Sequence, residues 1–133
     1  MPPAAAHTLI RYFKYGELGL DDVDLIVTGD LGYEGGAILC DLLYAEGYDI
    51  KDKYNDCGMI IYSRNTQDTH GGGSGCGCSA VVMASYILPK IERGELREVL
   101  FLGTGAMMSP SSIQQGESIP GVAHLVRLSK KEN

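Results

Sequence analysis

A glycine-rich segment that contains a serine and two cysteines offers the clearest candidate chemistry in this 133-residue sequence: His70-Gly71-Gly72-Gly73-Ser74-Gly75-Cys76-Gly77-Cys78-Ser79-Ala80. An apolar stretch typical of a helix follows directly, and backbone N–H groups at a helix start attract anions. The segment is not a P-loop, because no Gly-Lys-Ser/Thr ends it. It is not a hydrolase elbow either, because Cys76 and Val81 stand where that motif needs glycine. Anion binding and tight packing of the helix start remain as alternatives.

The two cysteines of this segment have three possible roles. A helix start lowers a thiol pKa, so Cys76 and Cys78 could serve as a nucleophile, a redox pair or metal ligands. Cys57 and His70 could complete a metal site. The spacing is Cys-x-Cys, however, and no second pair follows at a zinc-like interval. We therefore favour small, buried packing residues.

The remaining polar candidates form no catalytic set. His124 lies in an apolar strand pattern and is expected to be a core or edge histidine, and His7 lies on a helix. The turn Asn55-Asp56-Cys57-Gly58 either places a carboxylate near a thiol or forms an Asx-type turn. Asp30 or Asp56 could hold calcium, but that cation needs six to eight oxygen ligands. We predict no metal site and no cofactor.

Hydrophobic periodicity predicts the elements that position these residues. Helices are expected over residues 4–15, 35–46 and 79–91, and apolar strands over 24–28, 98–104 and 122–128. In the second helix we expect four residues to face inward: Ile38, Leu39, Leu42 and Leu43. Pro89 should kink the third helix and Gly94 should end it. Residues 59–62 receive no firm assignment. Alternating helices and strands predict an α/β layered fold whose last two strands are antiparallel.

Length and composition predict one soluble domain. With 44% hydrophobic residues the chain can bury a core, and no apolar run is long enough to span a bilayer. No secretion signal is recognised, so four cysteines suggest a reducing compartment. The net charge of −6 argues against nucleic acid as a partner. Acidic side chains are concentrated in residues 1–70, where they form either a partner-facing surface or a set of solvated loops and helix faces.

Five segments, in order along the chain, resemble the stage V sporulation protein AD family: 25–31 (LIVTGDL), 54–58 (YNDCG), 72–80 (GGSGCGCSA), 104–110 (TGAMMSP) and 114–120 (QQGESIP). The resemblance implies an α/β chain that is the C-terminal half of a thiolase-like fold, with layered helices on a mixed sheet. Residues 1–133 would then form a single thiolase-like C-terminal domain, with the N-terminal half of the family absent.

The resemblance also implies a function without catalysis. Members of the family bind dipicolinic acid, which can be present as its calcium chelate. They belong to a spore channel complex that takes up dipicolinic acid and calcium during sporulation and releases them in germination. The expected location is the forespore or spore inner membrane, as a peripheral subunit without a transmembrane segment. The expected partners are the membrane subunits of that complex, and a homo-oligomer is possible.

The resemblance further assigns the candidate site. By eye, the two positions that carry His and His or Asn in thiolase-like enzymes fall on Gly29 and Ser74, neither of which can act as the base. The expected ligand-binding residues are Gly29, Asp30, Ser74, Gly75, Cys76 and Gly105, the last offering a backbone N–H to an oxyanion. No catalytic residue is expected. The alternatives are a thiolase- or ketoacyl-synthase-like acyltransferase that uses Cys76 or Cys78, and a structural half-domain that dimerises without ligand.

Overall fold

The chain forms helices packed around one sheet. The computed structural model describes residues 1–106, 109–119 and 121–131. The helices are α1 (Pro2–Tyr15), α2 (Gly32–Ala45), α3 (Cys57–Ile60), α4 (Cys76–Val82), α5 (Leu88–Arg93) and α6 (Pro110–Gln114). The strands are β1 (Leu25–Thr28), β2 (Tyr54–Asp56), β3 (Glu98–Leu102) and β4 (Leu125–Ser129). Two 3-10 turns, at Leu20–Asp22 and Lys51–Lys53, complete the pattern. No helix in the described ranges is both long and apolar enough to cross a membrane.

The four strands form one mixed sheet in the order β2-β1-β3-β4. β1 is parallel to β2 and to β3, whereas β4 is antiparallel to β3. The predicted α/β class and the antiparallel pairing of the last two strands are therefore confirmed. The parallel strands β1, β2 and β3 end at the same edge of the sheet, where α/β proteins usually bind ligands. The thiolase-like assignment stays a prediction of the resemblance.

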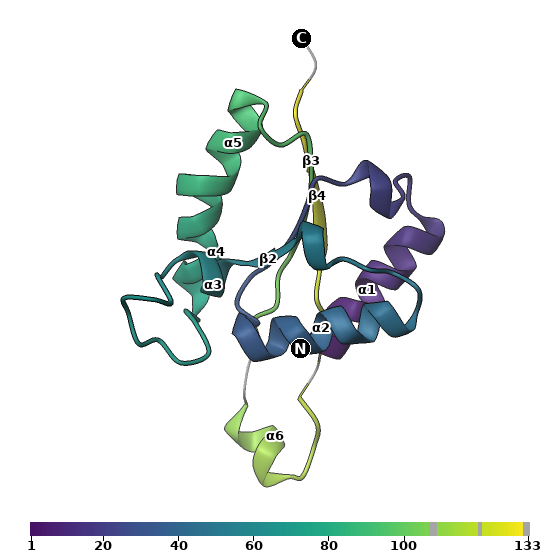
Figure 1. Ribbon diagram of the computed structural model, residues 1–133. Helices are drawn as coiled ribbons and strands as arrows, with labels where there is room; N and C mark the ends of the chain where they lie inside the picture. Colours follow the sequence, from purple (N-terminus) through teal and green to yellow (C-terminus); the bar gives the residue numbers. More distant parts are fainter. Residues whose placement is uncertain (107–108, 120, 132–133) are drawn as a thin grey trace.

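Helices lie on both faces of the sheet (Figure 1), and each face packs against its own apolar core. Successive strand residues point to opposite faces, so Ile26 of β1 packs with α1 and α2, whereas Val27 packs with α4 and α5. In β3, Leu100 and Val99 divide in the same way. Helices cover both faces, which explains why these strands are apolar at nearly every position.

The second predicted helix is present as α2, but part of its inward face was predicted incorrectly. Leu39 and Leu43 are fully buried, whereas Ile38 is 50% exposed and Leu42 is 37% exposed. Gly36 and Cys40 are buried in their place. The true inward stripe follows the spacing 36, 39, 40 and 43, which is one helix face, whereas 38 and 42 are turned toward solvent.

The third predicted helix begins earlier than expected, at Cys76, and continues to Arg93. A π-helical turn over Met83–Ile87 joins α4 to α5. The irregularity predicted at Pro89 thus lies one turn earlier, and Pro89 occupies the first turn of α5, where its missing N–H is tolerated. Gly94 ends the helix with a φ of +77°, as predicted.

Several short elements fall where sequence patterns were weak. The three-residue β2 and the four-residue α3 occupy residues 54–60, which comprise the turn considered at 55–58 and the start of the unassigned segment 59–62. α6 lies within the predicted loop between the last two strands. β3 ends at Leu102 and β4 begins at Leu125, later than the predicted Val122. Such short elements contain too few residues to establish a period.

Candidate functional site

The structure brings all six predicted site residues to one hollow at the carboxyl edge of the sheet. The hollow has a volume of about 500 Å³ and lies between the segments after β1 and β3 and the start of α4. Its lining consists of Gly29, Asp30, Ser74, Gly75, Cys76, Ser79, Gly103, Thr104, Gly105 and Ala106. Because parallel strands end together, residues that follow β1 and β3 meet here. Ligand binding by these residues stays a proposal, developed below.

Asp30 is the electrostatic centre of the hollow. Its carboxylate accepts hydrogen bonds from Thr104 Oγ1 (2.9 Å) and Ser74 Oγ (3.1 Å), and a longer one from the Gly75 N–H (3.4 Å). The Asp30 N–H in turn donates to Thr104 Oγ1 (2.9 Å). No Lys, Arg or His lines the hollow among the described residues. The Asp30 carboxylate thus already accepts hydrogen bonds from Ser74 Oγ and the Gly75 N–H, the donors that the sequence suggested for a ligand anion.

Thr104 is the main site residue that sequence reasoning missed. It is 4% exposed, and its hydroxyl joins the segment after β3 to the segment after β1. The signal was present, because Thr28-Gly29-Asp30 and Leu102-Gly103-Thr104 are similar polar ends of two adjacent parallel strands. Recognising it required knowing that those strands are neighbours.

Glycines around the hollow leave open space in front of the backbone. A Cβ atom added at Gly75, Gly103 or Gly105 would meet no atom within 4 Å. Gly29 differs, because its Cβ would lie 3.2 Å from Thr104 Oγ1 and its N–H donates to the Leu102 carbonyl at 3.0 Å. Gly29 therefore allows close packing, whereas Gly75, Gly103 and Gly105 leave room for a ligand to approach the main chain.

The preceding glycines, by contrast, are packing residues. The Gly73 N–H donates to the Gly58 carbonyl at 2.7 Å, and the Tyr33 N–H donates to the Gly71 carbonyl at 2.9 Å. A Cβ at Gly58 would overlap the Gly73 carbonyl, and one at Gly32 would overlap that of Gly71. For residues 71–73 the structure thus decides between the two alternatives in favour of tight backbone packing.

Asp56 anchors this packing from inside the protein. The side chain is fully buried and accepts four hydrogen bonds: from Thr28 Oγ1 (2.6 Å), Leu31 N (2.8 Å), Gly32 N (3.0 Å) and Gly58 N (2.9 Å). Asp56 thus caps α3, as the Asx-type alternative predicted, and also holds the loop between β1 and α2. With every acceptor position used, it is a structural carboxylate.

The cysteines do not form the sites that were considered. Cys78 of α4 and Cys57 of α3 are buried in the same apolar core, whereas Cys76 is exposed, contrary to the prediction of a buried packing residue. Burial raises the pKa of Cys78, and burial followed by the Asp56 charge raises the pKa of Cys57 to about 12. The expected lowering of the pKa is therefore wrong for Cys78, because its side chain points into the core.

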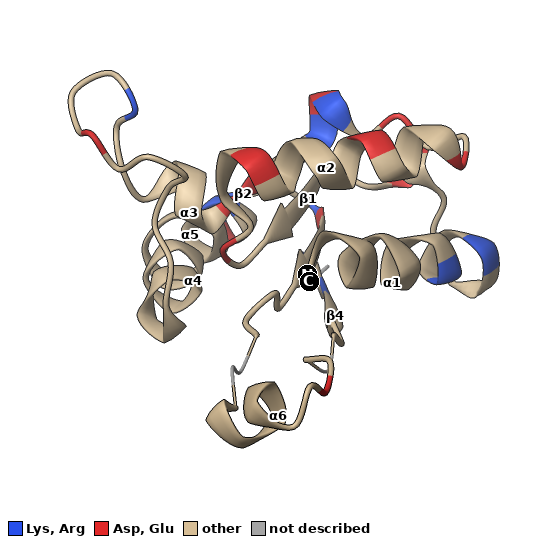
Figure 2. Cartoon of the chain, turned by 90° about the horizontal axis from the view of Figure 1, so that it is seen from below, with Lys and Arg blue, Asp and Glu red and all other residues tan. Residues whose placement is uncertain are grey.

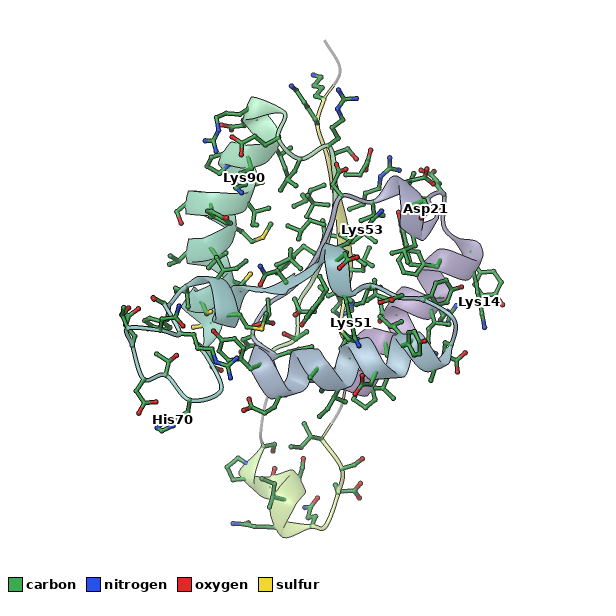
Figure 3. All side chains as sticks on the ribbon, viewed as in Figure 1. Lys14, Asp21, Lys51, Lys53, His70 and Lys90 are labelled. Carbon is green, nitrogen blue, oxygen red and sulfur yellow. The ribbon has the colours of Figure 1, made fainter. Side chains whose placement is uncertain are left out.

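A metal site built from the cysteines is not assembled either. His70 lies on the loop between α3 and α4 with an exposed side chain that points away from the core (Figure 3). Among the described residues, no group of three or more His, Cys, Asp or Glu side chains could hold a metal ion. His124 and His7 are both exposed, at β4's amino end and on α1.

Thiol reactivity should separate Cys76 from the other three cysteines. With Ellman's reagent at pH 8, we expect one thiol per folded chain to react within minutes, because Cys76 alone is exposed and the others are buried. Cys76→Ser should abolish this fast phase, whereas Cys78→Ser should leave it intact. A second fast-reacting thiol in the folded protein would contradict the arrangement.

This sequence matches known proteins along nearly its whole length. A family model described as "Stage V sporulation protein AD (SpoVAD)" matches residues 1–129. The chain is also 47% identical over 124 residues to stage V sporulation protein AD of Bacillus subtilis (strain 168). This alignment covers 93% of the chain and 36% of the relative, so the chain spans about a third of the relative's length.

Proposed function

The chain belongs to the stage V sporulation protein AD family, and on that premise we propose that it functions in sporulation as a non-catalytic, dipicolinic acid-binding part of a spore channel complex. The proposed site is the hollow around Asp30, Ser74 and Gly105. The proposed partners are the membrane subunits of that complex, at the forespore or spore inner membrane. The complex would carry dipicolinic acid and calcium inward during sporulation and outward in germination.

The open backbone of the hollow is the observation that carries this proposal. Dipicolinic acid is a flat aromatic ring with two carboxylates, so it can lie close to a main chain that has no side chains in front of it. Gly75, Gly103 and Gly105 leave such space. The volume of about 500 Å³ is within the range of small-molecule sites. Ser74 Oγ is exposed at the rim and can turn from Asp30 to a ligand oxygen.

The charge of Asp30 favours the calcium chelate over the free acid. Free dipicolinate carries two negative charges and would be repelled by a carboxylate in a hollow whose described lining has no basic side chain. The calcium chelate is neutral, and its metal accepts further oxygen ligands. Asp30 would supply one of them. The chelate is therefore the ligand form that best fits this hollow.

The acyltransferase alternative lacks a histidine base among the described residues of the hollow. Such chemistry would use Cys76, which is the exposed thiol at the rim, and would require a neighbouring group that removes the thiol proton. In the alignment by eye, Gly29 and Ser74 fall on the positions where thiolase-like enzymes carry such groups, and no histidine lines the described part of the hollow. These features support the proposal that the chain is not an enzyme.

Calorimetric titration with dipicolinic acid tests the proposed site. We expect saturable heat from the wild-type chain and none from Ser74→Trp, because the indole would fill the rim of the hollow. Ser63→Trp, on the exposed loop after α3, is the matched control and should bind normally. Unchanged heat in Ser74→Trp would refute this location. No heat from any variant, with a dimer or larger species on a sizing column, would favour the structural half-domain.

Calcium should strengthen the binding of dipicolinic acid through the Asp30 carboxylate. In the wild-type chain we expect calcium to tighten dipicolinic acid binding by about tenfold, equivalent to about 1.4 kcal/mol. In Asp30→Asn we expect the preference to disappear, because the charge that repels the free dianion and attracts the metal is gone. Asp68→Asn, on the exposed loop, should behave like wild type. Equal calcium dependence in Asp30→Asn and wild type would exclude this role of Asp30.

A further inference from the structure

A second concave region, the α1–β4 groove, shares no lining residue with the hollow around Asp30. It consists of two adjoining hollows of about 640 and 620 Å³ between α1 and the segment that leads into β4. Both hollows are lined by Thr8, Val122 and Ala123, so they form one elongated groove. Thr8 Oγ1 donates to the Ala123 carbonyl at 2.8 Å and holds its two walls together.

The walls of the α1–β4 groove have an unusual charge. Arg11 and Arg127 line the groove, no Asp or Glu lines it among the described residues, and Lys14 lies one turn after Arg11 on α1. In Figure 2, the charged residues of α1 are all basic, whereas the neighbouring α2 carries acidic residues. In a chain of net charge −6, this is a local basic surface.

The basic side chains differ in their availability. Arg127 pairs with Glu98 at 2.8 Å and with Glu17 at 2.7 Å, so its charge is already compensated. Arg11 forms no ion pair in the part of the chain that the structure describes. Lys14 lies farther along the same helix and points outward (Figure 3). Arg11 and Lys14 are therefore free to meet an anionic partner.

The sheet edge beside the groove is also unpaired. β4 is the last strand of the sheet, and no strand within the described residues pairs with its outer edge. On β4, Leu125 and Arg127 face α1, whereas Val126 faces the other way and is 49% exposed. A strand added at this edge would therefore present alternate side chains to the basic wall of α1 and to apolar surface near Val126.

We propose that the α1–β4 groove binds an extended acidic peptide segment of a partner protein, which adds to the free edge of β4. Acidic side chains at every second position face the α1 wall that carries Arg11, and the apolar ones between them contact Val126 on the other side of the sheet. The concave shape suits an extended chain better than a planar lipid surface. This inference is independent of dipicolinic acid binding.

Fluorescence anisotropy with a labelled Val-Glu-Val-Glu-Val-Glu-Val-Glu peptide tests the groove. We expect saturable binding that weakens at high salt, and no binding of the matched Val-Gln peptide, because the attraction is charge-dependent. Arg11→Gln should weaken binding by about fivefold, while Arg93→Gln, an exposed arginine on α5, should not change it. Val122→Asp should abolish binding, because it adds a carboxylate beside Arg11 that repels the acidic peptide. Since Val122 is 60% exposed, the replacement does not disturb the core.

Several outcomes would overturn the proposal. These are no binding of the Val-Glu peptide, equal binding of the Val-Gln peptide, or unchanged affinity in both Arg11→Gln and Val122→Asp. Binding of phosphatidylserine vesicles that competes with the peptide and is lost in Arg11→Gln would assign the basic surface to a membrane instead. Circular dichroism of each variant ensures that a loss of binding is not a loss of fold.

Discussion

Replacement of Asp56 by alanine is expected to lower the free energy of unfolding by about 4 kcal/mol, a large part of the stability of a small domain. The substitution leaves four donors buried without an acceptor: Thr28 Oγ1 and the N–H groups of Leu31, Gly32 and Gly58. Each such orphan costs about 1–3 kcal/mol, and partial relaxation reduces the sum. Urea unfolding followed by circular dichroism measures the loss.

Two further variants make the Asp56 result specific. Asp56→Asn keeps one carbonyl oxygen but turns an amide NH2 toward two donors, so we expect about half of the alanine effect. Asp52→Ala removes an exposed carboxylate from the turn before β2 and should change stability by less than about 0.5 kcal/mol. If Asp56→Ala unfolds at the same urea concentration as Asp52→Ala, Asp56 does not anchor the glycine segment.

Replacement of Gly32 by alanine is expected to cost about 3 kcal/mol or more. Gly32 has a φ of +69°, which disfavours any residue with a Cβ, and that Cβ would overlap the Gly71 carbonyl. Since the Tyr33 N–H also donates to Gly71, the glycine segment cannot move away without losing this hydrogen bond. Thermal or urea unfolding of the variant measures the cost.

Two glycines separate the causes of the Gly32 effect. Gly47 has a φ of +90° but open space around its Cβ position, so Gly47→Ala should cost only the backbone strain, about 1 kcal/mol. Gly77 lies in α4 with open space and an ordinary φ, so Gly77→Ala should stabilise by about 0.5 kcal/mol. Equal effects of Gly32→Ala and Gly47→Ala would show that the contact with Gly71 is unimportant.

The candidate site was predictable to an unusual extent because the resemblance supplied what periodicity cannot. Gly29, Ser74 and Gly105 are far apart in sequence, and only knowledge of the family grouped them before the strand order was known. The structure adds that they line one hollow together with Asp30. It also adds Thr104, and it corrects the electrostatics, because Ser74 Oγ and the Gly75 N–H, the donors before α4, already donate to the Asp30 carboxylate.

Where single residues were predicted incorrectly, the cause was local. Ile38 and Leu42 are as hydrophobic as Leu39 and Leu43, so composition could not tell which pair faces the core. Cys76 and Cys78 are two residues apart on a helix, and a helix turns by about 200° over that distance. One is therefore exposed while the other is buried.

The sequence by itself determined the α/β class, the main helices and strands, and the family, because these depend on hydrophobic period and on short motifs that lie within one segment. Tertiary structure decided which glycines serve packing and which leave space, since that depends on atoms from distant segments. Gly58 and Gly105 look alike in sequence. One faces the Gly73 carbonyl and the other faces open space, and only the folded chain distinguishes them.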